Sequence, residues 1–161
     1  MSEDIKRWGG PAAPPRNFAE LADHYALAQL AKIYALGMDM RDYALARSAF
    51  APEAIAHGKQ GPEPIDQSLP KTYGVAESFH ATQHVISNQY IHLDGDDAIV
   101  WSYGVAHHKV APGEKRDEII AGVQYRDICK RFAEGWLITE RSIYPHWIDI
   151  AAERNPSANP G

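Results

Sequence analysis

The sequence predicts an α+β fold in which three helices near the N-terminus pack on one face of a curved, mostly antiparallel sheet. Helical apolar spacing is confined to the chain before about residue 80. Beyond that point, four long extended segments follow one another, separated by turn signals rich in Asp, Gly and Pro. Helices followed by an antiparallel meander are typical of the α+β class, and 161 residues suffice for one domain with its own core.

The first helix is expected to begin after Asn17, because Asn is a favoured N-cap and Glu20, three residues later, completes a capping-box pattern. A broad apolar face continues to about Leu36, and Gly37 is expected to stop the helix. Ala51-Pro52 ends a second, short helix. The remaining elements before the sheet are expected as follows: helices over residues 43–50 and 72–80, a strand over residues 53–58, and a polar, proline-bearing loop over residues 59–70.

Turn signals delimit the four strands of the expected sheet. Asp94-Gly95-Asp96 is typical of a hairpin turn, and Ala111-Pro112-Gly113 and Glu134-Gly135 mark the next two reversals. Pro145 is expected to end the last strand, because it lacks a backbone N–H. The expected strands cover residues 83–93, 98–110, 118–132 and 136–144.

The chain is expected to form one domain over residues 17–150, with no internal repeat and no linker. Residues 1–16 contain Gly9-Gly10-Pro11 and Pro14-Pro15, which disfavour regular structure, so this segment is expected to be a disordered leader. Residues 151–161 are expected to form a polar C-terminal tail.

Composition excludes several classes of function. The net charge of -5 argues against nucleic acid as a partner, since phosphate binding needs clustered Lys and Arg. No apolar run approaches the length of a membrane span, and the Met-Ser-Glu-Asp start lacks a signal-peptide pattern, so a cytoplasmic location without membrane contact is expected. Cys129 is the only cysteine, which excludes an intrachain disulfide and indicates a packing residue in an alternating strand.

Both faces of the second strand carry large apolar side chains. Trp101, Tyr103 and Val105 lie on one side and Val100 on the other. A sheet with one face in water would alternate more cleanly, and one domain has too few helices to cover both faces. The sequence therefore predicts a homo-oligomer.

Candidate chemistry centres on His84, because the common phosphate-binding, nucleophile-elbow and zinc motifs are absent. His80 and His84 are four residues apart but lack a third metal ligand, so no metal site and no cofactor are expected. His84 has apolar neighbours, which favours burial, and a buried imidazole needs partners for its ring nitrogens. We expect Asp39, at the end of the first helix, to be that partner.

Structural alternatives stay open for each candidate. His84 could be a core histidine bonded to a backbone carbonyl, and Asp39 could cap the second helix, a role for which Asp42 competes. Arg141 shares a strand face with apolar residues and could enter a pocket or form a surface ion pair with Glu140 or Asp127. Tyr34 and Asp39 lie about 140° apart on an ideal helix, so both reach one pocket only if the helix bends or ends near Gly37.

Six short motifs are distributed over the expected domain: Asp39-Met40-Arg41-Asp42, Phe50-Ala51-Pro52, Phe79-His80-x3-His84-x3-Asn88, Asp94-Gly95-Asp96, Tyr125-Arg126-Asp127 and Gly135-Trp136-x4-Arg141. With these motifs the chain resembles the SnoaL-like branch of the NTF2-like superfamily, a cone-shaped α+β fold, from about Phe18 to Trp147. The resemblance extends to hexachlorocyclohexane dehydrochlorinase, scytalone dehydratase and bile-acid 7α-dehydratase, which are enzymes of similar plan.

The resemblance implies a cofactor-free lyase of the dehydratase type, or an isomerase. In such enzymes a His base is oriented by an Asp, while an Arg and a Tyr or Lys handle the carbonyl and the leaving group; by position these are His84, Asp39, Arg141 and Tyr34. The implied substrate is a hydrophobic, ring-containing molecule such as a steroid, polyketide or aromatic compound. Strand parity and family position indicate Phe79, Val105, His107 and Tyr125 as pocket walls.

Two other functions are compatible with the same resemblance: a polyketide cyclase, and a binding or scaffold domain without catalysis. An enzyme requires His84 and Asp39 within hydrogen-bond reach beside a cavity, whereas a scaffold would have a filled cone. The family also favours a trimer over a dimer as the oligomer.

Overall fold

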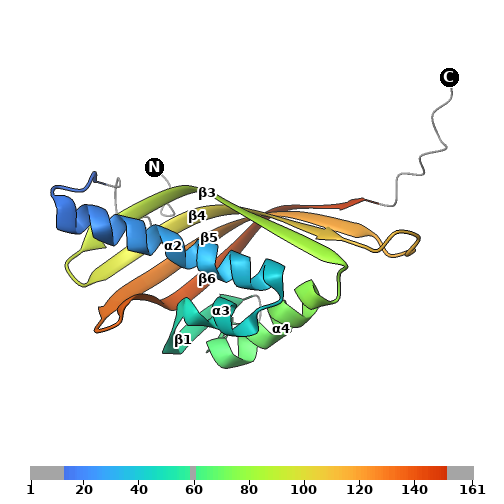
Figure 1. Ribbon diagram of the computed structural model, residues 1–161, viewed down its shortest axis with the longest axis horizontal. Coiled ribbons are helices and arrows are strands. Elements are labelled where there is room, and N and C mark those ends of the chain that lie inside the picture. The colour runs from blue at the N-terminus through green and yellow to red at the C-terminus, as the bar shows by residue number, and fades with distance from the viewer. Residues whose placement is uncertain (1–12, 59–60, 152–161) are drawn as a thin grey trace, which may run out of the picture.

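A computed structural model of the protein describes residues 13–58 and 61–151. The described part confirms the predicted fold class, since helices pack on one face of a curved, six-stranded sheet (Figure 1). The elements are α2 (Phe18–Met40), α3 (Tyr43–Ser48), β1 (Phe50–Gly58), β2 (Gly61–Pro64), α4 (Ile65–Glu77), β3 (Ala81–Asp94), β4 (Asp97–Lys109), β5 (Glu118–Phe132) and β6 (Gly135–Ala151).

The sheet has the strand order β2-β1-β6-β5-β4-β3, and only the β1–β6 pair is parallel. Helix α2 lies across one face of this sheet, with α3 and α4 beside its C-terminal half (Figure 1). The core between the layers joins Leu27 and Met38 of α2 to Val100, Cys129 and Ile138 of the sheet, all buried. Strand β3 is an edge strand, which matters below because its outer N–H groups are available to α2.

Helix α2 begins at the expected cap, where Asn17 Oδ1 accepts from the Glu20 N–H at 3.0 Å. It ends four residues later than expected, since Arg41 takes a left-handed backbone conformation (φ 60°) at its C-terminus. Gly37 does not stop the helix. A Cβ at this position would lie 2.3 Å from the backbone nitrogen of Ala46, so Gly37 allows α3 to pack directly against α2.

The proline-bearing segment before α4 is the largest error of the sequence-based prediction. Residues 61–64 form β2, an antiparallel partner of β1, and α4 begins at Ile65 and ends at Glu77. Pro70 lies inside this helix without ending it. Ile65 and Leu69, four residues apart and both buried, supply the apolar contact that outweighs the loss of one helical hydrogen bond. Residues 59–60 lie outside the described part.

Strand β6 continues through Pro145 to Ala151, so the expected end at Tyr144 is wrong. The register of the β5–β6 pair shifts between Gly122 and Val123, opposite Pro145 and Trp147. A proline without an N–H is tolerated at such an irregularity, since the regular ladder is already interrupted there.

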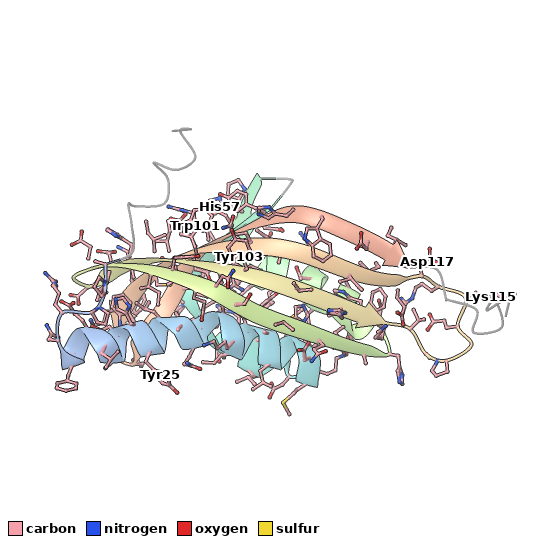
Figure 2. The ribbon with its side chains drawn as sticks, turned by 90° about the horizontal axis from the view of Figure 1, so that it is seen from above. Tyr25, His57, Trp101, Tyr103, Lys115 and Asp117 are labelled. Atoms are coloured by element: carbon pink, nitrogen blue, oxygen red, sulfur yellow. The ribbon has the colours of Figure 1, made fainter. Side chains whose placement is uncertain are left out.

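The two faces of the sheet differ in their cover. His57, Trp101 and Tyr103 lie on the side that faces away from α2, and Lys115 lies in the loop between β4 and β5, beyond the end of the helix layer (Figure 2). No helix in the described ranges is long and apolar enough to cross a membrane. Most of the expected leader and the C-terminal tail, residues 1–12 and 152–161, lie outside the described part.

Candidate functional site

Asp39 and His84 are in direct contact. Asp39 Oδ1 lies 2.6 Å from His84 Nδ1, and Asp39 Oδ2 accepts the backbone N–H of His84 at 2.8 Å. The imidazole is 7% exposed and the carboxylate 22% exposed. Because an ionised carboxylate only accepts, the neutral ring carries its proton on Nδ1, and Nε2 keeps a lone pair.

Local structure explains this contact. Helix α2 runs one turn beyond Gly37 and so carries Asp39 to the edge of the sheet, where β3 offers the free N–H of His84. The competing role for Asp39 is taken by Asp42, whose carboxylate accepts the N–H of Leu45 at 2.9 Å and caps α3. Asp39 is thus left free to bind the histidine.

His108 lies beside His84, and the sequence analysis missed it. The two ring centroids are 5.7 Å apart, and the Phe79 ring lies 5.0 Å from that of His108. Burial, followed by the charge of His84, lowers the pKa of His108 from its ordinary value. The site therefore pairs an imidazole held by a carboxylate with a second imidazole that favours the neutral form.

The expected walls Val105 and His107 lie on the opposite face of the sheet, which corrects the strand-parity prediction. Counting back from the Asp94–Asp97 pair would place His107 opposite His84, but a bulge between Ser87 and Tyr90 adds one residue to β3. His84 therefore pairs with Ala106, and the side chains of β4 change faces relative to the count. The signal for this bulge is Asn88, one of the few residues that tolerate its φ of 45°.

Arg141 forms a buried ion pair with Asp127. Its Nε and Nη2 donate to the two carboxylate oxygens at 2.7 Å each, and the two side chains are only 3% and 1% exposed. Of the two partners that the sequence offered, Asp127 is the one used, but the pair is buried and not on the surface, and Glu140 instead bonds His57 at 2.9 Å. Nη1 of Arg141 is buried and has no hydrogen-bond partner among the described residues.

Aromatic rings surround the Arg141 guanidinium. The rings of Tyr34, Phe50 and Tyr125 lie 4.5, 5.0 and 4.7 Å from its central carbon. Burial by itself lowers the pKa of Arg141, but the carboxylate of Asp127 raises it overall, so the guanidinium stays charged.

Tyr34 and Tyr125 lie beside each other at the Arg141 guanidinium. Their ring centroids are 6.2 Å apart, and burial raises the pKa of both phenols. Arg141, Asp127 and also Asp39 act electrostatically on both rings. Because α2 does not bend or end at Gly37, Tyr34 enters the core beside Arg141 while Asp39 reaches the sheet edge. The four expected catalytic residues thus form two separate contacts, Asp39 with His84 and Arg141 with the ring of Tyr34.

A row of apolar residues, called the floor below, crosses the sheet beside His84. His84 is followed across the strands by Ala106, Ala121 and Ile148, a row that lies on the helix side of the sheet. Ala106 is buried, whereas Ile148 is 56% exposed, because the strands continue past the helix layer at this end (Figure 1).

The described residues contain no group of three or more His, Cys, Asp or Glu side chains that could hold a metal ion. The chemistry that the site offers by itself is acid–base chemistry: an accepting Nε2, two buried phenols that can donate, and a fixed guanidinium.

Known proteins resemble this chain in sequence profile and in fold. Residues 19–142 match the sequence profile of a SnoaL-like domain. No curated protein matches the chain. Among solved structures, a Kribbella flavida protein superposes with a TM-score of 0.72 at 19% identity, covering 80% of this chain and 94% of its own.

Two further structures carry names of activities. A Novosphingobium aromaticivorans protein with a provisional scytalone dehydratase name gives a TM-score of 0.71 at 20% identity, covering 88% of this chain and 97% of its own. A type 2 hexachlorocyclohexane dehydrochlorinase gives 0.69 at 16% identity, covering 83% and 91%. At these identities the likeness establishes the shared fold.

Proposed function

This chain belongs to the SnoaL-like domain family of the NTF2-like fold, and on that premise we propose that it is a cofactor-free lyase of the dehydratase type. The observation that carries the proposal is the 2.6 Å contact between Asp39 Oδ1 and His84 Nδ1. It supplies an oriented general base inside a fold whose solved relatives include a dehydrochlorinase.

The proposed reaction is a β-elimination next to a carbonyl group. Nε2 of His84 takes a proton from the carbon beside the carbonyl, the C–H electron pair forms the new double bond, and the C–O bond to the neighbouring carbon breaks. The imidazolium of His84 gives the same proton to the departing hydroxide, which leaves as water and restores the neutral base. Asp39 stabilises the imidazolium that forms. A base placed in this way contributes on the order of 10²–10⁴-fold in rate. Return of the proton to another carbon would give an isomerase from the same residues.

Tyr34 and Arg141 have supporting roles in this proposal. The raised pKa of Tyr34 keeps its phenol protonated, and Tyr34 is proposed to donate to the enolate oxygen. Because Tyr34 is buried beside Arg141, this role requires the substrate to reach from His84 into the core. Two of the Arg141 nitrogens already bond Asp127, so only Nη1 is left to donate to the departing oxygen. Phe79 and Tyr125 are proposed as walls.

The substrate is proposed to be a hydrophobic, ring-containing molecule of the steroid, polyketide or aromatic kind. The floor of Ala106, Ala121 and Ile148 offers apolar contact and no charge. Cyclisation of a polyketide would use the same base. The alternative is a binding domain without catalysis. One observation favours it: the Arg141 guanidinium is already paired with Asp127, which leaves less of it for a substrate.

The protein is proposed to act in the cytoplasm as a homo-oligomer, with a trimer favoured by family resemblance and a dimer as the alternative. The sheet face away from α2 exposes large apolar side chains of β3 and β6, among them Val85, Tyr144 and Trp147. A second copy would cover them. Light scattering should give a dimer or trimer mass that Trp147→Lys reduces, whereas a monomeric wild type would contradict this assembly.

The function is tested by activity against a panel of β-hydroxy ketones on steroid, polyketide and aromatic frames. The wild type is expected to release water from at least one of them, and His84→Ala is expected to abolish this. The matched control is His80→Ala, because His80 is an exposed histidine four residues before His84, and this variant should keep full activity. Full activity in His84→Ala would end the proposal.

A further inference from the structure

The carboxylate of Asp39 is held by more than the histidine. Its Oδ1 also accepts the hydroxyl of Thr82 at 3.0 Å, so the two oxygens receive three hydrogen bonds in total. Thr82 in turn receives a hydrogen bond from Arg41 Nη1 at 2.8 Å. The sequence analysis assigned no role to Thr82 or to Arg41, and the reaction described above does not use them.

The direction of this chain of hydrogen bonds is fixed by chemistry. A guanidinium can only donate, so Thr82 must accept from Arg41. The single hydroxyl proton of Thr82 is then directed to Asp39. Asp39 is therefore kept as an acceptor towards His84, and its carboxylate plane cannot rotate without breaking a bond at each oxygen.

Arg41 is itself rigidly placed. It ends α2 in the left-handed conformation, and its guanidinium also donates to the carbonyls of Met38 at 2.7 Å and Phe79 at 3.2 Å. One side chain thus ties the last turn of α2 to the segment that leads into β3. A side chain held by several hydrogen bonds in this way can fix the geometry of the site beside it.

We propose that Thr82 and Arg41 are positioning residues that act through Asp39 to hold His84 with its proton on Nδ1 and its Nε2 free. The effect on rate rests on the proposed lyase or isomerase function, whereas the effect on the imidazole tautomer does not. This separation allows the two proposals to fail independently.

The test compares Thr82→Val, which keeps the shape but removes the hydroxyl, with Thr82→Ser, which restores it. Thr139→Val is the matched control, because the Thr139 hydroxyl bonds only the carbonyl of Ile128, at 3.1 Å. In ¹⁵N-histidine NMR of the folded proteins, the wild type and Thr82→Ser should show the Nδ1–H tautomer of His84. Thr82→Val should shift the ring signals towards a mixture of tautomers, and Thr139→Val should not.

With a substrate in hand, Thr82→Val is expected to lower kcat about 10-fold with little change in KM, as for the loss of one hydrogen bond to a charged group. Thr82→Ser should recover most of the rate. Arg41→Met should shift the tautomer in the same direction, and it replaces Thr82→Val as the test should that variant fail to fold.

The experiments distinguish a failure of the positioning role from a failure of the proposed function. A tautomer shift in a protein that turns over no substrate would support the positioning role and count against the proposed function. Tautomer signals in Thr82→Val and Arg41→Met that equal those of the wild type would overturn the positioning role, even if kcat fell.

Discussion

The protein contains two carboxylate–cation contacts on the helix side of the same sheet, and they differ in almost every physical respect. Asp127 and Arg141 are sealed in the core, share two hydrogen bonds and carry permanent charges. Asp39 and His84 lie at the sheet edge, and this pair contains an imidazole whose Nε2 is not used by the carboxylate. The rings of Tyr34 and Tyr125 pack against the core pair, at Arg141.

The different burial and charge of the two pairs determine what chemistry each can perform. A buried guanidinium with a matched carboxylate cannot release or accept a proton at working pH, so it fixes charge and geometry. An imidazole at an open edge can accept one proton and return it. In the proposed reaction the edge pair carries the proton transfer, and the core pair holds its charges in place and contributes only the Nη1 donor of Arg141. The predictions below test this division, from the largest expected effect to the smallest.

Asp127→Asn is expected to cost about 3–5 kcal/mol of the free energy of unfolding, because it leaves the Arg141 charge buried without a counter-charge. Urea unfolding measures this. The control is Asp97→Asn, which removes the exposed pair with Lys130 and should cost less than about 1 kcal/mol. Equal costs for the two variants would mean that the core pair is not the sealed contact described above.

Asp39→Asn is expected to lower kcat by about 10²–10⁴-fold, since an amide no longer stabilises the imidazolium of His84. Its loss of stability should be smaller than that of Asp127→Asn, because the Asp39 side chain is partly exposed. The matched control is Asp42→Asn at the cap of α3, where Asn is as good a cap as Asp, so both activity and stability should be retained. Steady-state kinetics of both variants, on any substrate found, measures the predicted fall in kcat.

The double variant Asp127→Leu/Arg141→Met is expected to regain the stability lost in Asp127→Asn to within about 1–2 kcal/mol of the wild type, since apolar replacements of both partners remove the unpaired charge. Activity should stay below that of the wild type, because the proposed donor to the departing oxygen is gone. A double variant with wild-type activity would restrict the core pair to a purely structural role.

The smallest expected effect is the pH dependence of stability that His108 contributes. Its pKa is lowered in the folded protein by burial and then by His84, with Arg41 acting in the same direction and Asp39 and a backbone hydrogen bond at Ile119 in the opposite one. The unfolded state then binds protons more readily, so stability should fall as the pH drops below about 6.5 towards the folded-state pKa.

His108→Asn is expected to flatten the stability profile in that window. Urea midpoints at pH 7.5, 6.5 and 5.5 measure it in both proteins. The carboxyl of Asp23, whose pKa is lowered chiefly by its hydrogen bonds to Arg131, loses its contribution only at lower pH and so does not interfere. Parallel profiles for the two proteins would exclude His108 as the titrating group.

Local sequence signals explain which parts of the fold and site were predictable. Apolar spacing and turn residues predicted the class, the order of helices and strands apart from β2, and the cap at Asn17, while Asp39 and Asp42 stayed alternatives for the cap of α3. Prolines misled at two places: Pro70 lies in a helix whose buried face outweighs it, and Pro145 lies in a strand at a register shift. In both, long-range packing decided against a local preference.

The sequence by itself determined that a histidine with apolar neighbours and a carboxylate at the end of a helix were candidates for contact, and the structure brings them within 2.6 Å. Only the tertiary structure decided that His108, not His107, shares their face, since a single bulge residue reverses side-chain parity along a strand. It also decided between Glu140 and Asp127 as the partner of Arg141, buried that pair, and placed Thr82 and Arg41 behind Asp39. Such contacts depend on register and packing between segments far apart in the chain, which local composition does not encode.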